Sequence, residues 1–420
     1  MTHHELPVVP TVAPPGPGTG RAPSGTPQTG RLTGIDLARG LAVLGMYCAH
    51  VGPDATVGGP VGFLFELTHG RSSALFAVLA GFSLVVLTGR PRPRTGRAGR
   101  QAKGRVAVRA VVLIALGYAL TDLDTSVEVI LVCYGLLFLA VLPLARLRSG
   151  QLAVVAAAGA LALPQLWYAV RMSAETSGWA DTVVALDPLA RLTGTDGFVE
   201  VLFTGSYPAL TWMPFMVAGM AVGRLDLGRP GVRRRLALTG GALTVLGYGG
   251  SWLALHLAGP GALRVIGAAT DGGPATTAWW SDVVGTPVDR IPLAWLLVAA
   301  PHSQTTPSVL GGTGVALLVI AGCLAAAARL PRLTRTATPL SAVGRTALTA
   351  YVLHIVALWA LTDLWYVPAL EDDSGLSTLP VLFAFVAVAL VAATVWTRRH
   401  RRGPLEQVLH TVTGVATRIR

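Results

Sequence analysis

Long apolar runs, separated by short arginine-rich or acidic connections, set the strongest limit on how this chain can fold. A helix that crosses a lipid bilayer needs about 20 mainly apolar residues, and about ten segments approach that length. The predicted spans are Ile35–Val51, Leu64–Leu87, Val106–Leu120, Val127–Ala145, Leu152–Val170, Pro208–Val222, Leu236–Leu257, Val309–Ala328, Leu340–Leu361 and Leu379–Val395. A shorter run, Ile291–Ala300, predicts a further half-span or re-entrant segment. The pattern indicates an all-α fold, a polytopic transmembrane helical bundle of about ten helices.

The composition agrees with a lipid environment. Charged residues make up 13% of the chain and hydrophobic residues 52%, whereas an ordinary soluble domain has roughly 25% charged residues. The net charge of +12 does not indicate nucleic-acid binding, because the basic residues cluster between apolar runs without interleaved aromatic residues. We therefore expect the lipid bilayer as a partner, and no nucleic acid. All basic residues except Lys103 are arginine, which is typical of a bacterial genome rich in G and C.

The basic residues also predict the topology, because cytoplasmic loops carry an excess of Lys and Arg. The connection Gly89–Arg109 is strongly basic and contains no acidic residue. Every second connection repeats this pattern, whereas Thr121–Glu128 and Leu364–Asp373 are acidic or mixed. An even number of spans with cytoplasmic ends satisfies both observations. We expect a multi-pass protein of the plasma membrane with its N- and C-termini in the cytoplasm.

The chain divides into three predicted parts. Residues 1–30 are rich in Pro, Gly and Thr and lack an apolar core, so we expect a disordered cytoplasmic tail. Residues 31–402 form the transmembrane domain, and residues 403–420 form a cytoplasmic C-terminal tail. Two outer connections, Arg171–Tyr207 and Ala258–Ser308, are long, and loops of such length are usually functional or partly disordered.

Ionisable residues in a membrane span are costly and therefore mark candidate functional sites. The first span contains Asp36, Arg39 and His50. His50 lies eleven positions after Arg39, so the two return to nearly the same helix face with a rise of about 16 Å. An imidazole can act as a general base at neutral pH, which makes His50 the first catalytic candidate. The alternative is that Asp36 and Arg39 form only an interfacial pair at the helix start and that His50 is an interfacial residue just before Gly52–Pro53.

Two further histidines are predicted on the outer half of the membrane. His69 lies near Arg71 in the second predicted span, and His354 lies in the ninth. Imidazoles from three helices could bind a metal ion, but the sequence contains no short-spaced ligand pair. We therefore expect no metal, and treat His69, Arg71 and His354 as substrate-binding candidates.

Several motifs resemble known families. Arg39, ten intervening residues and His50 resemble the first-helix motif of the membrane acyltransferase-3 family, whose histidine is taken to be catalytic. Leu75–Ser83 and Tyr351–His354 are similar to two further stretches of that family. The bacterial domain-of-unknown-function 418 family, related to the heparan-alpha-glucosaminide N-acetyltransferase catalytic domain, resembles the chain more closely. The segments that carry this resemblance are Gly205–Pro208, Gly219–Leu225, Gly344–Tyr351 and Gly403–Glu406.

This resemblance implies an acyltransferase-3-like bundle with O- or N-acyltransferase activity. The enzyme would move an acyl group, in the first instance acetyl, from a cytoplasmic donor such as acetyl-CoA or another acyl-CoA. The acceptor would lie on the outer side and be a carbohydrate or another component of the cell envelope. On this interpretation His50 would take the acceptor's proton or carry the acyl group, with Arg39 and Asp36 in support.

The same resemblance implies a role for the basic connection. Arg105 and Arg109, together with Arg39, would bind the phosphates of the donor. The family commonly separates its two arginines by two residues, whereas three residues separate Arg105 from Arg109 here. The simpler explanation for this connection is that its charge only sets the topology.

Two other classes of function remain compatible with the sequence. A transporter or exporter of a small molecule would use the same polar stripe to line a path, although no inverted repeat or pair of broken helices is evident. A structural or signalling membrane protein without small-molecule chemistry is the third possibility.

Overall fold

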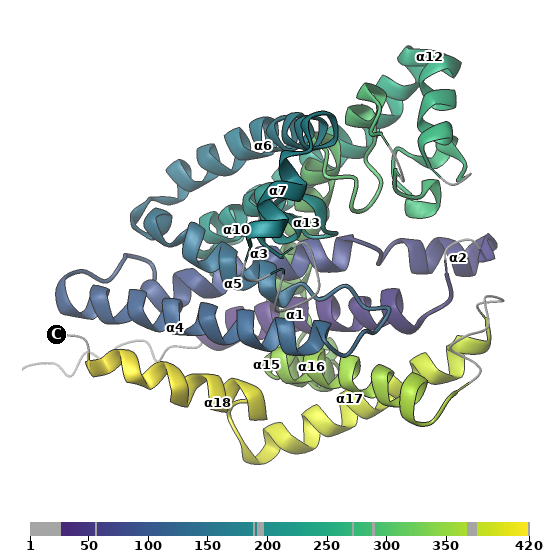
Figure 1. Ribbon diagram of the computed structural model, residues 1–420. Helices are drawn as coiled ribbons and strands as arrows, with labels where there is room; N and C mark the ends of the chain where they lie inside the picture. The colour runs from purple at the N-terminus through teal and green to yellow at the C-terminus, as the bar shows by residue number, and fades with distance from the viewer. Residues whose placement is uncertain are drawn as a thin grey trace, which may run out of the picture.

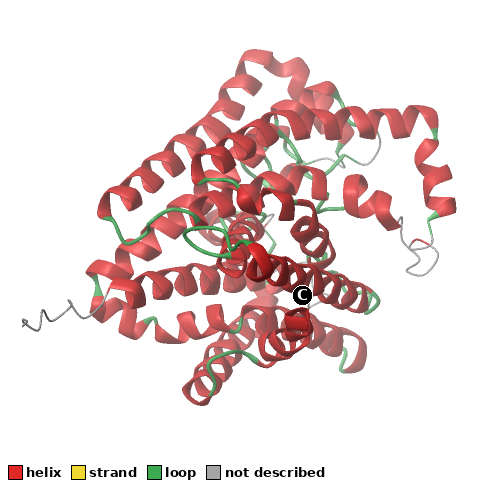
Figure 2. Cartoon of the chain, turned by 90° about the vertical axis from the view of Figure 1, so that its left-hand side faces the viewer, coloured by secondary structure: helices red, strands yellow, loops and turns green. Residues whose placement is uncertain are grey.

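The computed structural model describes residues 27–54, 57–187, 190, 197–270, 273–287, 290–367 and 376–418. Within these ranges the chain consists of helices joined by loops, as Figure 1 and Figure 2 show. The β-type pairing in the described ranges is an isolated bridge between Thr270 and Pro287. The predicted all-α bundle is therefore confirmed. The predicted tail, residues 1–30, lies outside the described residues apart from its last four, which belong to the first helix.

The α-helices that build the bundle are long in its centre and short in the connections. In chain order they are α1 (Pro27–Val51), α2 (Gly59–Glu66), α3 (Arg71–Thr88), α4 (Gly96–Thr121), α5 (Leu131–Ala140), α6 (Ser149–Ser177), α7 (Trp179–Leu186), α9 (Gly197–Val199), α10 (Ala209–Gly223), α11 (Pro230–Thr244), α12 (Gly250–Ala269), α13 (Thr306–Arg329), α14 (Pro331–Thr336), α15 (Thr338–Arg345), α16 (Ala347–Trp359), α17 (Leu379–Arg399) and α18 (Pro404–Thr413).

Six helical segments among the described residues are long and apolar enough to cross a membrane. They are Gly59–Thr88, Gly96–Thr121, Ser149–Ser177, Thr306–Arg329, Ala347–Leu364 and Leu376–Arg399. Two shorter apolar helices, α5 and α10, accompany them. By this criterion the predicted number of about ten spans was too high.

The four predicted spans that do not qualify fail for physical reasons. The helix α1 contains charged residues along its first half, which lower its mean hydropathy. The helices α5 and α10 contain 10 and 15 residues, fewer than a perpendicular crossing needs. In the remaining run a π-helical turn, Val245–Gly249, joins α11 to α12, and glycines dilute the apolar residues. Each of these four runs nevertheless forms helix.

Close helix packing holds α3 against α10. A Cβ atom built on Gly81 would collide with the carbonyl oxygen of Met216, and one built on Gly219 would collide with that of Val78. The absence of a side chain at both glycines therefore allows the two backbones to approach, as small residues do in membrane bundles. The helix α1 packs against α3, α13 and α15, so it lies inside the bundle.

The long connection between α12 and α13 packs onto the end of the bundle. Within it, Ile291–Ala300 contains a 3-10 turn of five residues, Leu293–Leu297, and no longer helix. The Trp295 side chain is almost fully buried in a separate apolar cluster with Trp167 and Ile266. This segment is therefore a packed loop, and the predicted half-span was wrong.

The C-terminal segment is more ordered than a simple tail. The helix α18 and the 3-10 turn Gly414–Arg418 lie against α4, and α18 also contacts α16 (Figure 1). The Glu406 carboxylate accepts hydrogen bonds from the backbone N–H groups of Leu348 and Thr349, at 2.7 and 3.3 Å, and from Oγ1 of Thr349 at 2.6 Å. Glu406 thus caps the N-terminus of α16.

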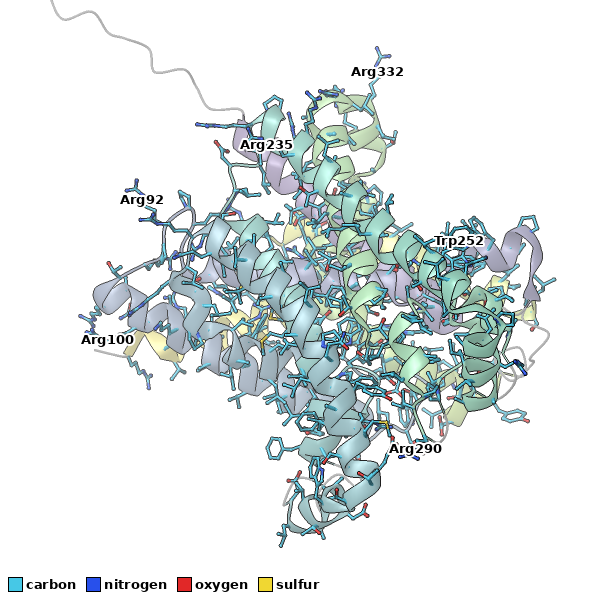
Figure 3. All side chains as sticks on the ribbon, turned by 90° about the horizontal axis from the view of Figure 1, so that it is seen from above. Arg92, Arg100, Arg235, Trp252, Arg290 and Arg332 are labelled. Atoms are coloured by element: carbon cyan, nitrogen blue, oxygen red, sulfur yellow. The ribbon has the colours of Figure 1, made fainter. Side chains whose placement is uncertain are left out.

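Hydrogen bonds from two arginines hold the connection between α3 and α4 against the end of α10. Arg224 donates hydrogen bonds to the carbonyl oxygens of Gly89 and Ala145. Arg90 Nε donates to the carbonyl oxygen of Gly223 at 2.6 Å. Figure 3 places Arg92 and Arg100, from the same basic stretch, on the opposite side of the view from Trp252 of α12.

Candidate functional site

The first-helix histidine forms a pair with the late histidine. His50 Nδ1 lies 2.9 Å from His354 Nε2, and the two ring planes are within 9° of parallel with centroids 5.2 Å apart. Tyr47, one turn earlier on α1, stacks on His354 and donates its hydroxyl proton to the carbonyl oxygen of Ala350 at 2.8 Å. Residues 304 positions apart in the sequence therefore meet in the protein interior.

Hydrogen bonding determines which nitrogen of His50 is free. His354 Nδ1 contacts the carbonyl oxygen of Tyr351, which can only accept, so this nitrogen carries a proton. In the neutral ring, His354 Nε2 is then an acceptor, and His50 Nδ1 must be the donor between them. A neutral His50 consequently has its lone pair on Nε2, where it can act as a base or a nucleophile.

An apolar groove lies beside His354. It encloses about 1050 Å³, including space open to the surroundings, and runs between α16 and α17. Its lining includes Thr346 and Pro404 as well as Tyr47 and His354. The His50–His354 pair is therefore adjacent to an open, hydrocarbon-lined surface.

A second imidazole site lies at the start of α3. His69 Nδ1 is 2.6 Å from Asp282 Oδ2, and the Asp282 backbone N–H donates to Glu66 Oε1 at 3.0 Å. Burial alone would raise the pKa of Asp282, but hydrogen bonds with the His69 and Glu66 side chains outweigh it and hold the pKa at about 2. The Asp282 carboxylate is therefore ionised at neutral pH.

Arg71 closes the ring of polar groups around His69. Its guanidinium donates to the carbonyl oxygens of Glu66 and Trp280, at 2.7 and 2.5 Å, and lies 4.0 Å from Glu66 Oε1. The same cation lies over the rings of Tyr248 and Trp280, with 5.0 and 5.7 Å to the centroids. Arg71 is 7% exposed, so it is held in place inside the protein.

A narrow cleft joins these residues, with about 30 Å³ of space open to a water-sized molecule. Its lining includes His69, Arg71, Trp212, Tyr248, His302 and Gln304. His302 and Gln304 have positive φ angles of 57° and 60°, a conformation that costs energy for residues other than glycine. Their Nδ1 and Nε2 atoms lie 3.3 and 3.0 Å from the carbonyl oxygen of Ser206. Strained backbone of this kind clusters at functional sites.

The predicted charged pair forms near the middle of α1. Arg39 Nη1 lies 3.1 Å from Asp36 Oδ1 and donates to the carbonyl oxygen of Gly344 at 3.2 Å. Arg39 Nη2 donates to Ser83 Oγ at 3.3 Å. The guanidinium therefore contacts α3 and the end of α15, and lies within the protein.

The structure separates the two arginines of the basic connection. Arg109 lies within electrostatic range of Arg39 and Glu406, and its Nε is buried without a hydrogen-bond partner among the described residues. Arg105 instead lies within electrostatic range of His410 on α18. Arg109 therefore shares a region with Arg39, whereas Arg105, one turn earlier on α4, lies within electrostatic range of the C-terminal helix.

The cluster of Glu66, His69 and Asp282 also has the residue types of a cation site. Its ligand atoms lie within 4.8 Å of one another. The His69–Asp282 hydrogen bond already engages one histidine nitrogen and one carboxylate oxygen of this cluster. The contacts therefore fit an imidazole–carboxylate pair better than a metal centre.

These features define a class, namely a multi-pass helical membrane protein with buried imidazoles and a polar cleft. The family model described as "Heparan-alpha-glucosaminide N-acetyltransferase, catalytic" matches residues 31–252, which is more than half of the 420-residue chain. The chain belongs to this family. The model described as "Protein of unknown function (DUF418)" matches residues 275–416. No curated protein matches the chain. The predicted family resemblance is thus confirmed.

The motifs that carried the resemblance lie at contacts of the site. Ser206 of the first motif receives the hydrogen bonds of the strained cleft residues. Gly344 of the third accepts from Arg39 and abuts the backbone of Asp36, and Tyr351 of the same motif holds His354. Glu406 of the fourth caps α16. The motifs therefore position the imidazoles and the charged pair.

Proposed function

We propose that this protein is a membrane-embedded acyltransferase that moves an acetyl or other acyl group from a cytoplasmic acyl-CoA to an outer-side acceptor. The acceptor is a carbohydrate or another cell-envelope component. The availability of His50 Nε2 carries this proposal, because the contact with His354 holds the proton of His50 on the opposite nitrogen. Family membership supports the reaction class.

His50 and His354 have different parts in the proposed reaction. His50 Nε2 attacks the carbonyl carbon of the thioester, the C–S bond breaks, and the thiolate leaves. His354 is a positioning residue, since its hydrogen bond with His50 fixes the tautomer of His50 and keeps the two ring planes nearly parallel. This arrangement follows the general pattern in which a nucleophile is oriented by a second side chain.

The donor's phosphates are proposed to bind near the other end of α1. Arg39 is fixed there by Asp36 and Gly344, and Arg109 has a buried donor group without a partner among the described residues. Two guanidinium groups in one region favour a phosphate-bearing ligand. Arg105, which lies within electrostatic range of α18, contributes at most long-range attraction.

The test uses the full-length protein in lipid nanodiscs with radiolabelled acetyl-CoA and D-glucosamine as the acceptor probe. His50→Ala should lower the rate of label transfer by about 100-fold or more, the range expected for loss of a catalytic imidazole. His256→Ala is the matched control, because this exposed histidine on α12 contacts the carbonyl oxygen of Trp252 in its own helix and should leave the rate unchanged.

Equal rates for wild type and His50→Ala would contradict the role of His50. The rival class, a transporter, has its own signature. Flux of glucosamine into proteoliposomes without any acyl donor, together with no label transfer by the wild type, would overturn the acyltransferase proposal.

A further inference from the structure

His50 and His69 have different hydrogen-bond partners, and the proposed reaction uses His50 but not His69. His50 is paired with a neutral imidazole, whereas His69 is paired with an ionised carboxylate. His69 and His302 lie within electrostatic range of His50. The two imidazole sites therefore belong to one region, and His69 faces the polar cleft.

The free nitrogen of His69 is the second observation. The Asp282 carboxylate accepts at Nδ1, which places the lone pair of the neutral ring on Nε2. His69 Nε2 is buried and has no hydrogen-bond partner among the described residues, although buried polar atoms are normally satisfied. An acceptor group entering the cleft would supply the missing partner.

The surroundings suit the charge that a base acquires. When Nε2 takes a proton, the ring becomes an imidazolium, and the Asp282 carboxylate 2.6 Å from Nδ1 stabilises it. Glu66, which is 2% exposed, accepts a hydrogen bond from the Asp282 backbone N–H and so holds the Asp282 backbone in position. Burial lowers the pKa of His302 below its ordinary value, so this neighbouring ring stays neutral and does not repel the new charge.

We infer that His69, oriented by Asp282, is the general base that takes the proton of the acceptor in the cleft. This inference rests on the proposed function and assigns separate tasks to the two imidazoles. The acceptor nitrogen or oxygen attacks the acyl carbon carried on His50 Nε2, and a new bond to that carbon forms. The bond between the carbon and Nε2 breaks, and its electron pair returns to His50. The acceptor proton moves to His69 Nε2 and then to water.

The inference accounts for a carboxylate at position 282, which packing alone would not require. An apolar side chain there would fill the same space without the cost of partly desolvating a carboxylate. The pair instead links a helix start to a loop 213 positions later in the chain. Burying ionisable groups in this way is a frequent feature of catalytic sites.

The test compares two acceptors on Asp282→Asn and His69→Gln. The acceptor probes are D-glucosamine, whose ammonium must lose a proton before it attacks, and hydroxylamine, which is uncharged at neutral pH and attacks without a base. Both variants should transfer acetyl to glucosamine about 100-fold more slowly than wild type. Both should transfer to hydroxylamine at the wild-type rate, after subtraction of the His50→Ala background.

A second readout isolates the first half of the reaction. In a single turnover without acceptor, both variants should release the CoA thiol as fast as the wild type, because His50 is intact. Asp181→Asn, an exposed Asp-to-Asn change on α7, is the matched control and should behave as wild type in every assay. Thermal unfolding confirms that each variant is folded.

The outcomes separate this inference from the proposed function. Equal losses with both acceptors, or slowed CoA release, would show a structural role for the His69–Asp282 pair and overturn the inference. Unchanged transfer to glucosamine would also overturn it. If the wild type itself releases no CoA, the proposed function fails, whatever the variants do.

Discussion

Replacing Glu406 tests whether the C-terminal helix holds the helix that carries His354. Glu406→Ala removes the acceptor of three hydrogen bonds, from two backbone N–H groups at the start of α16 and from Thr349 Oγ1. A hydrogen bond contributes a net of about 0.5–1.5 kcal/mol, so the expected loss of stability is about 2–3 kcal/mol. Glu406→Gln keeps an acceptor but loses the charge that favours a helix N-terminus, so about 1 kcal/mol is expected.

The assay is thermal unfolding of the detergent-solubilised protein, followed by tryptophan fluorescence. Glu175→Ala is the control, because Glu175 makes a single ion pair with Arg171 at 3.7 Å on the surface of α6, an interaction worth about 0–1 kcal/mol. The unfolding midpoint should be highest for Glu175→Ala, lower for Glu406→Gln and lowest for Glu406→Ala. If Glu406→Ala unfolds at the same temperature as Glu175→Ala, the capping contact does not stabilise α16.

Two further changes test the packing and the electrostatics. Gly219→Val should lower the unfolding temperature strongly, because the added Cβ would collide with the Val78 carbonyl oxygen. Gly241→Val should change it little, because no atom lies within 4 Å of a Cβ built there. Similar unfolding midpoints for the two variants would contradict the close approach of α3 and α10. Burial lowers the pKa of His302 from 6.5, so the unfolded state binds the extra proton and stability should fall as the pH drops below about 6.5. His302→Gln should lose less stability than wild type between pH 7 and pH 5, and identical pH dependences of the unfolding midpoint would refute this sign.

The residues of the first helix were predictable because their information is local. Asp36 and Arg39 lie one turn apart and form the expected pair, and the face shared by Arg39 and His50 follows from helical periodicity. The structure adds that both side chains contact other helices, through Ser83 and His354. Periodicity identifies a helix face, but it does not say which partner that face meets.

Asp282 and His302 were missed because their importance comes from contacts far along the chain. Both lie in the long connection Ala258–Ser308, whose length was the available signal. Glu66 was the more visible omission, since it is a carboxylate inside the predicted span Leu64–Leu87, and intramembrane carboxylates are functional candidates.

The predicted number of spans failed where apolar runs were interrupted. Counting hydrophobic residues treats Val127–Ala145 as one element, but the helix begins at Leu131 and ends at Ala140. Similarly, the predicted span Leu340–Leu361 is divided at Thr346, where α15 ends and α16 begins. Breaks of this kind depend on backbone geometry and tertiary packing, which hydropathy does not record.

Asp282 lies on a loop and His69 lies at a helix start, so the hydrogen bond between them depends on how the loop packs against the bundle. Arg71 donates to the backbone of Trp280 in the same loop, so withdrawal of the loop would break this contact and the His69–Asp282 hydrogen bond together. In the proposed mechanism His69 would then lack its carboxylate partner, so it would be a weaker base while the loop is withdrawn.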